Sequence, residues 1–374
     1  MALKTEPFTV NIGPQHPSTH GVFRIQVTVD GETIVDLKPV MGYLHRGTEK
    51  LAEEKTYTQC IPYTDRMDYL AAMSNELGYV LAVEKLAGIE APPTGARWLR
   101  MIFAELQRIA SHLFAAATFY QDLGGWGTAI MYMLGRDREQ ILDLFEMTCG
   151  QRLTTNYMRI GGVAQDIPPE FLPALKKFLA EMPGRIDEYY DFLAESDLLI
   201  TRTKGVGILP KELAIACGCS GPMLRGSGVP WDLRKTNPYL YYDEVDFDVI
   251  VGQNGDCYDR FMVRFWEIGQ SLRIIEQCLE RLPLGDIRHP FSPDFISGTF
   301  RPPKGEVYAA VEGPKGELGY YLVSNGTTAP YRFHVRAPSL INLTPFREMC
   351  IGWKVADLIV ILGSVDIVVG EVDR

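Results

Sequence analysis

The sequence predicts an α+β fold in which a small N-terminal β-unit and a C-terminal β-unit flank a bundle of long helices. Three observations predict it. An alternating apolar pattern opens the chain, apolar residues at helical spacing fill its middle, and strand-like runs follow a proline-rich connector near its end. We therefore expect units at residues 1–63, 64–283 and 284–374.

The N-terminal unit is predicted to contain a β-hairpin. One face of its first strand is apolar: Phe23, Ile25, Val27 and Val29. Asp30-Gly31 is a strong hairpin-turn signal, so the return strand is expected from Thr33 to Leu37.

The middle of the chain is predicted to be helical. Thr64 or Asp65 can cap a first helix that ends at Gly88. Pro92-Pro93 opens a second helix, which runs to Gly124-Gly125 and approaches about 45 Å at about 1.5 Å per residue. Further helices are expected at 136–149, 169–181, 186–198, 211–217 and 256–281.

The C-terminal unit is predicted to be a sheet followed by an apolar segment. Strands are expected at 306–311, 319–323 and 332–336, since Gly, Pro and Asn turns separate these runs. The apolar segment 355–369 is expected to return into the core.

Composition restricts the possible partners and compartments. The 374 residues carry a net charge of −10, which argues against nucleic acid as a partner. No uninterrupted apolar run reaches the length of about 18 residues that a membrane span needs, and the N-terminus lacks the apolar stretch of a signal peptide. We expect a soluble, cytosolic chain that can still dock onto a membrane partner. Its seven scattered cysteines are expected to be reduced and mostly buried.

The turn from Gly13 to Gly21 holds two of the six histidines, His16 and His20, between prolines and glycines. Imidazole titrates near neutral pH, so a rigid loop with two of them suits proton or metal chemistry. A metal site would need His45 or His112 as a further ligand. Two alternatives to a metal site also remain for this turn: a hydrogen-bonded structural loop and a loop that donates protons to a ligand.

Two further places carry candidate functional groups. The run from Thr64 to Tyr69 is either an acidic first helical turn or a turn that aims the hydroxyl of Tyr69 into a cavity. Asp122 lies near the C-terminus of the long helix, where a carboxylate is disfavoured. It is therefore either paired, for example with a histidine, or exposed at a frayed end.

Several motifs, in order along nearly the whole chain, resemble one family. They are Gly13-Pro-Gln-His-Pro-Ser-Thr-His-Gly21, Gly42-Tyr-Leu-His-Arg-Gly-Thr-Glu-Lys50, Arg66-Met-Asp-Tyr69, Leu81-Ala-Val-Glu-Lys-Leu86, Tyr157-Met-Arg-Ile-Gly-Gly162, Gly221-Pro-Met-Leu-Arg-Gly-Ser-Gly228, Trp231-Asp-Leu-Arg-Lys235, Pro303-Lys-Gly-Glu-Val-Tyr308, Gly316-Glu-Leu-Gly-Tyr-Tyr321 and Val372-Asp-Arg374. The sequence is similar to the 49-kilodalton-type (D-type) subunits of NADH:quinone oxidoreductase, respiratory complex I.

The resemblance implies a fold related to the large subunit of nickel–iron hydrogenases. Those enzymes hold their metal with two CxxC pairs, but this chain has at most Cys60 at the corresponding places. The resemblance therefore implies no metal in this chain and a quinone in the former metal cavity. His20 and Tyr69 would bond the two quinone carbonyl oxygens, and Asp122 would orient His20.

The resemblance also implies partners. Arg46 and Arg66 would lie beside an iron–sulfur cluster carried by a partner subunit, while other peripheral-arm subunits (B, C and I types) and a membrane subunit (H type) complete the complex. Quinone reduction, with NADH or ferredoxin as electron donor, would be coupled to proton translocation. The chain would be peripheral on the cytoplasmic side of the cell membrane.

One departure from the family pattern affects the chemistry. Members often carry a histidine after the Gly-Gln-Arg motif, and this chain has Leu153 after Gly150-Gln-Arg152. Without that imidazole, redox-linked protonation should weaken and the cluster potential should fall, which favours a low-potential quinone such as menaquinone. Two rival interpretations remain: a non-catalytic scaffold of a membrane-bound hydrogenase-like complex, and a hydrogenase-like metal enzyme.

Overall fold

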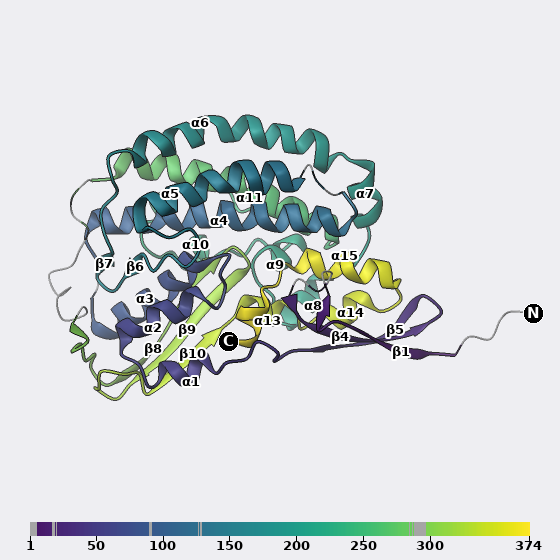
Figure 1. The fold of residues 1–374 in the computed structure, drawn as a ribbon, viewed down its shortest axis with the longest axis horizontal. Coiled ribbons are helices and arrows are strands. Elements are labelled where there is room, and N and C mark those ends of the chain that lie inside the picture. Colours follow the sequence, from purple (N-terminus) through teal and green to yellow (C-terminus); the bar gives the residue numbers. More distant parts are fainter. Residues whose placement is uncertain are drawn as a thin grey trace, which may run out of the picture.

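The computed structural model describes residues 6–16, 19, 21–89, 92–125, 127, 129–283, 285, 287 and 297–374. Long helices lie together on one side of the molecule and the small sheets lie on the other, as Figure 1 shows. The prediction of an α+β fold is confirmed.

The N-terminal unit contains a three-stranded antiparallel sheet. Its strands are β1 (Phe8–Ile12), β4 (Arg24–Asp30) and β5 (Thr33–Val40), in the order β1-β4-β5. The predicted apolar face is buried, and the hairpin turns at Gly31, so both predictions are confirmed. A two-stranded ribbon of β2 (Gln15–His16) and β3 (Gly21–Val22) starts and ends the histidine loop.

Three helices follow: α1 (Thr48–Ala52), α2 (Tyr57–Asp65) and α3 (Ala72–Ala87). The prediction that a helix begins at Thr64 or Asp65 is wrong, because these two residues end α2. The helix that ends at Gly88 is α3, which begins at Ala72, whereas α2 begins after Thr56, whose side chain accepts the Gln59 N–H in a capping box. The predicted stop at Gly88 is confirmed for α3.

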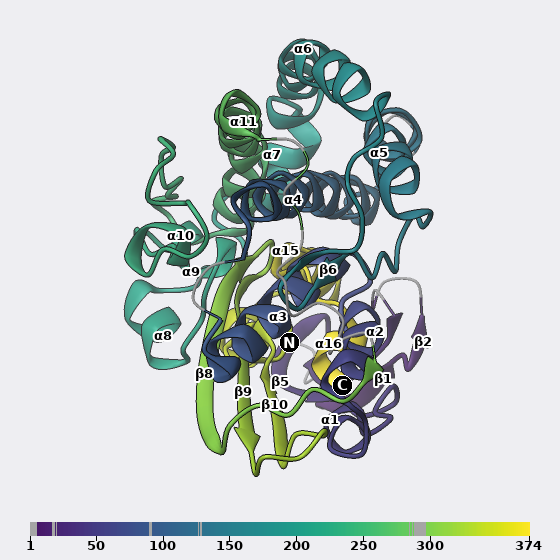
Figure 2. The same cartoon turned by 90° about the vertical axis from the view of Figure 1, so that its left-hand side faces the viewer.

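The bundle is built on α4 (Thr94–Asp122), which confirms the predicted long helix. The π-helix η2 (Ile130–Arg138) leads into α5 (Glu139–Cys149), and α11 (Cys257–Arg281) packs along α4. Figure 2 shows these helices above the strands β8 and β9.

Two helices predicted at 169–181 and 186–198 are instead one helix, α6 (Phe171–Tyr189), which continues as the π-helix η3 (Tyr190–Ala194). Pro183 does not end α6. The buried apolar face on both sides of this proline, from Phe171 to Tyr189, outweighs the backbone hydrogen bond that proline removes.

Shorter elements connect the bundle to the C-terminal sheet. They are β6 (Met158–Arg159), β7 (Gly162–Val163), α7 (Asp197–Thr203), α8 (Lys211–Ala216), α9 (Pro222–Gly226) and α10 (Leu233–Thr236).

The C-terminal sheet has the order β10-β9-β8 and covers α3. Its strands are β8 (Gly305–Gly313), β9 (Gly316–Ser324) and β10 (Arg332–Arg336), which confirms the three predicted strands. The helices α13 (Pro338–Asn342), α14 (Phe346–Cys350), α15 (Val355–Val365) and α16 (Val369–Asp373) follow. The expected return into the core is confirmed, since α15 packs on α4 and α11.

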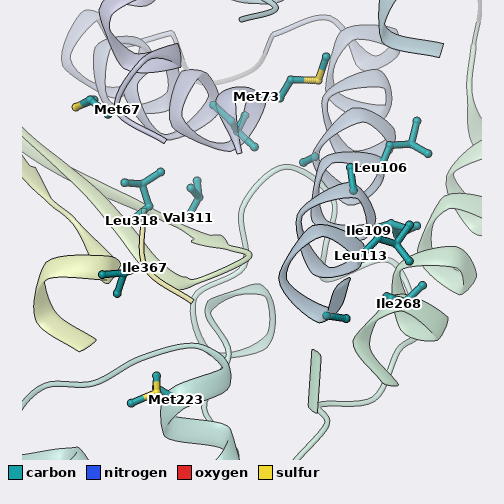
Figure 3. Packing of buried hydrophobic residues seen from close by; sticks show 14 of the residues in the cluster. Met67, Met73, Leu106, Ile109, Leu113, Met223, Ile268, Val311, Leu318 and Ile367 are labelled. Carbon is teal, nitrogen blue, oxygen red and sulfur yellow. The ribbon is translucent and has the colours of Figure 1, made fainter. Parts of the chain in front are cut away.

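One apolar core joins these parts. In Figure 3, Leu106, Ile109 and Leu113 of α4 lie near Ile268 of α11, and Ile367 lies near the C-terminal sheet. This core contains residues of all three expected units. The division of the chain into units at residues 63 and 283 therefore stays a prediction. Among the helices of the described residues, none has the length and apolar composition to cross a bilayer.

Candidate functional site

A cavity of about 400 Å³ lies between the end of α4, the turn after α2 and the segment that joins α15 to α16. Its lining combines apolar and polar side chains: Tyr69, Leu70, Phe114, Thr118, Gln121, Asp122, Ile359, Asp366, Ile367 and Val368. This composition and volume are typical of a site for a small organic ligand. Two of the predicted site residues, Tyr69 and Asp122, therefore share one cavity.

Tyr69 lies in the turn between α2 and α3. The Asp68 carboxylate accepts the Leu70 N–H at 3.0 Å and so shapes this turn, which means that the alternative of an acidic first helical turn is wrong. Gly370 of α16 packs on the same turn, where a Cβ would lie only 2.8 Å from the Met67 carbonyl oxygen. Partial burial, with the charge of Asp68, raises the pKa of Tyr69. Its hydroxyl is therefore protonated near neutral pH and can donate a hydrogen bond.

Asp122 is the last residue of α4, as expected, and is half-buried. A Cβ on Gly363 of α15 would lie 2.7 Å from Asp122 Oδ2. Glycine at 363 therefore permits the close approach of α15 that places Asp122 in the cavity wall. The alternative of an exposed residue at a frayed helix end is wrong.

His20 lies outside the described residues. Its described neighbours form a tight loop, in which the Thr19 hydroxyl lies 2.7 Å from the His16 carbonyl oxygen and 2.9 Å from that of Gly21. Gly21 packs against Val369, the residue after the cavity-lining Val368. The C-terminal base of the histidine loop is thus adjacent to the segment that lines the cavity.

The other histidines considered as metal ligands have different partners. His45 Nδ1 lies 2.6 Å from the carbonyl oxygen of Asp373, and His112 Nε2 lies 2.8 Å from Glu267. Cys60 is buried, and burial raises the pKa of its thiol to about 12. In the described parts of the chain, no three His, Cys, Asp or Glu side chains gather in a way that could hold a metal ion. These residues do not fit a thiolate-held metal.

Arg46 and Arg66 are brought together from different elements. Arg46 Nη2 donates to the Arg66 carbonyl oxygen at 2.9 Å, and Arg66 Nη1 donates to that of Pro62 at 2.7 Å. Both arginines are exposed, and neither forms an ion pair within the described residues. They form a positive patch on a chain whose net charge is −10.

Arg66 also lines a second, polar cavity of about 460 Å³, which we call the arginine pocket. Its lining consists of Pro62, Arg66, Cys149, Gln151, Thr154, Thr155, Asn156, Arg159, Ala164 and Gln165. Thr154 and Thr155 of this lining follow Leu153.

Sequence reasoning missed a buried charged group behind Tyr69. Lys315, in the β8–β9 turn, lies 3.1 Å from Asp68 Oδ2 and 3.3 Å from the Ser111 hydroxyl. Burial lowers the pKa of Lys315, but Asp366, Asp68 and Glu371 outweigh it and raise that pKa. A lysine in a Gly-Pro-Lys-Gly hairpin turn gives no sequence signal of burial, because such turns are usually exposed.

Comparison with known proteins shows which family the chain resembles. The model of the family described as respiratory-chain NADH dehydrogenase, 49 Kd subunit, matches residues 122–374. The chain is 57% identical to the D-type NADH-quinone oxidoreductase subunit of Dehalococcoides mccartyi over 374 residues, 100% of each chain. It is 54% identical to the first of the D-type subunits of Roseiflexus sp., again over 100% of each. Against the D-type subunit of Carboxydothermus hydrogenoformans it is 53% identical, over 99% of this chain and 100% of the relative.

Proposed function

The chain belongs to the 49-kDa subunit family of the respiratory-chain NADH dehydrogenase and is one subunit of a multisubunit NADH-quinone oxidoreductase, and on that premise we propose that its 400 Å³ cavity holds the quinone head group. The observation that carries the proposal is the meeting of Tyr69 and Asp122, from separate elements, in one cavity with both apolar and polar walls. An apolar wall suits the quinone ring, and the polar groups suit its two carbonyl oxygens.

The proposed chemistry is proton donation to a reduced quinone. Reduction to the quinol adds two electrons and two protons, and the protons end on the two carbonyl oxygens. The Tyr69 hydroxyl donates to one oxygen and His20 to the other. Asp122 orients His20 and raises its proton affinity through its negative charge. The packing of Gly21 on Val369, beside the cavity-lining Val368, supports this role for the histidine loop.

Electrons are proposed to arrive from an iron–sulfur cluster in a partner subunit. Arg46 and Arg66, which form no ion pair within the described residues, suit a face toward that cluster, because positive charge favours its reduced form. The B-, C- and I-type subunits and the membrane subunit of H type are the further proposed partners. The complex would couple quinone reduction to proton translocation, with this chain on the cytoplasmic side of the cell membrane.

A structure of the assembled complex with bound quinone tests this assignment. We expect the head group to lie within about 2.6–3.2 Å of the Tyr69 hydroxyl and of a His20 ring nitrogen. A head group bound outside the cavity would contradict the proposal.

Asp122→Asn is expected to lower quinone reductase activity about tenfold, which corresponds to a loss of about one pKa unit from His20. The nearby carboxylate raises the pKa of a histidine, so its removal lowers that pKa. Because the protonated imidazole is the proposed donor, the decline of activity with rising pH should begin at lower pH in the variant. Steady-state pH profiles measure both effects. Asp187→Asn, at an exposed position on α6, is the control and should leave the profile unchanged.

The missing imidazole at Leu153 predicts a low-potential quinone, with menaquinone as the proposed substrate. The midpoint potential of the partner cluster should change little with pH near neutrality, far below the roughly 59 mV per pH unit of a one-proton, one-electron couple. Leu153→His should steepen this dependence, since it restores a group that titrates there. Redox titrations at several pH values measure it, and a steep slope without the substitution would refute the idea.

A further inference from the structure

Two buried carboxyl groups face each other next to the arginine pocket. Asp65, the last residue of α2, and Glu76, in α3, are both 0% exposed, and both accept hydrogen bonds from the segment Thr155–Met158, which brings their carboxyl groups close together. An ionised carboxylate only accepts hydrogen bonds, so a hydrogen bond between the two groups needs a proton on one of them. Neither carboxyl group forms an ion pair with a lysine or arginine of the described chain. Two like charges in such a site cannot both persist.

The surrounding donors indicate which group holds the proton. Both oxygens of Glu76 already accept: Oε1 from the Thr155 hydroxyl at 2.8 Å and Oε2 from the Met158 N–H at 2.6 Å. Asp65 Oδ2 accepts the Asn156 N–H at 3.0 Å, whereas the buried Oδ1 receives no hydrogen bond from an N–H or hydroxyl group of the described residues. The hydrogen bonds around Glu76 therefore stabilise its ionised form. Asp65 Oδ1, which accepts none of these hydrogen bonds, is the oxygen that can carry the proton.

All three of these donors belong to one short segment, Thr155–Met158. Asn156 has a φ of 47°, in the left-handed region that asparagine tolerates, and this turn lets the segment aim its donors inward. Thr155 and Asn156 also line the arginine pocket, together with Arg66, the residue after Asp65. The two carboxyl groups thus hold the wall of the pocket in place.

We propose that Asp65 keeps its proton in the folded protein and donates a hydrogen bond to the ionised Glu76, forming a singly charged acid pair that positions the Thr155–Met158 segment beside Arg66. The pair then presents one negative charge behind the positive patch instead of two. Its influence on the partner cluster rests on the proposed function; its protonation state and positioning role do not.

The charges around the pair support this state. Burial raises the pKa of Asp65 to about 10, with a contribution from Glu76, while Arg66 acts in the opposite direction. Burial likewise raises the pKa of Glu76, against the hydrogen bonds that it accepts. The other facing groups are Cys149 from α5, Tyr157 and Tyr320, and burial raises the pKa of each, so they are neutral at pH 7. Asp65 therefore keeps its proton through the neutral range, while the hydrogen bonds that Glu76 accepts favour its ionised form.

Hydrogen exchange of the assembled complex tests the positioning role. In Asp65→Asn, the side-chain amide can donate to Glu76 while its oxygen accepts the Asn156 N–H, so the amides of Asn156 and Met158 should exchange as in the unmodified protein. Asp65→Ala should speed their exchange at least tenfold. Glu76→Gln should speed it more than Asp65→Asn, because an amide replaces a group whose two oxygens both accept. If Asp65→Asn exchanges like Asp65→Ala, or faster than Glu76→Gln, the proposal is overturned.

Two further measurements make the test independent of how well the alanine variant folds. The infrared difference between the unmodified complex and Asp65→Asn should contain the carbonyl band of a protonated carboxylic acid at neutral pH; a carboxylate band there would refute the assignment. The cluster potential should be unchanged in Asp65→Asn, because no negative charge is removed, and a rise would overturn the idea. Hydrogen exchange and infrared spectra need neither quinone nor cluster, so failure of the quinone-site proposal would leave these results interpretable.

Discussion

Replacing Tyr69 with phenylalanine is expected to lower kcat/KM for quinone reduction by about a hundredfold or more, within the range attributed to a positioned proton donor. The substitution removes one hydroxyl and keeps the ring, so the shape of the 400 Å³ cavity is retained. The assembly and iron–sulfur content of the complex should stay normal. Quinone titrations of the purified complex would measure kcat and KM separately.

The matched control for this experiment is Tyr190→Phe. Tyr190 lies on η3, is partly exposed, and does not line the cavity. The variant should retain full activity. Equal activities of the Tyr69→Phe and unmodified complexes would favour the rival interpretation, in which the cavity is only packing in a scaffold protein.

Removing the guanidinium of Arg225 is the second change with a large expected effect. Arg225 is buried, and its nitrogens lie 2.7 Å from Glu267 Oε1, 2.7 Å from Glu312 Oε1 and 3.6 Å from Asp232 Oδ2. Burial alone would raise the pKa of Glu267, but Arg225 and His112 outweigh it and hold that pKa at about 2. Arg225→Met would leave these acids without their shared cation and should destabilise the chain by about 3–5 kcal/mol.

The comparison for Arg225→Met is Arg273→Met. Arg273 pairs with Asp246 and Asp248 at the protein surface, where an ion pair contributes about 0–1 kcal/mol. Thermal inactivation and the amount of assembled complex would measure the difference. Similar losses in the two variants would show that the buried cluster does not stabilise the fold through its charges.

The low pKa of Glu267 also determines how the stability contributed by this cluster changes as the pH falls. A carboxyl group whose pKa is depressed in the folded state stabilises the protein above its unfolded pKa of 4.5, and this stabilisation is lost as the pH falls toward about 2. In the unmodified chain, the contribution of Glu267 should therefore be constant near neutrality.

Helices and strands that are determined by their own residues could be predicted from the sequence. The hairpin at Asp30-Gly31 and the long helix α4 follow from turn chemistry and apolar spacing, and both were predicted correctly. The start of α2 was missed although its capping box at Thr56 and Gln59 is a local signal. The break predicted between residues 181 and 186 is wrong, because the buried face that holds α6 together across Pro183 depends on packing.

The candidate site divides in the same way. Tyr69 and Asp122 were singled out from residue type and helix position, Arg46 and Arg66 from the family resemblance, and the two members of each pair lie together in the described structure. Lys315 could not be found from its sequence context, since only the approach of the β8–β9 turn to Asp68 and Ser111 buries it. The placement of His20 stays a prediction.

The sequence by itself determined the α+β class, the main helices and strands, the family and the identity of the groups able to donate protons. The tertiary structure decided which of these groups meet and what charge they carry. Asp65 and Glu76 are ordinary acids in the sequence, and only their joint burial and the donors of a distant loop make one of them neutral. Residue type sets what a side chain can do, whereas the loss of water and the neighbours gained on folding set its protonation.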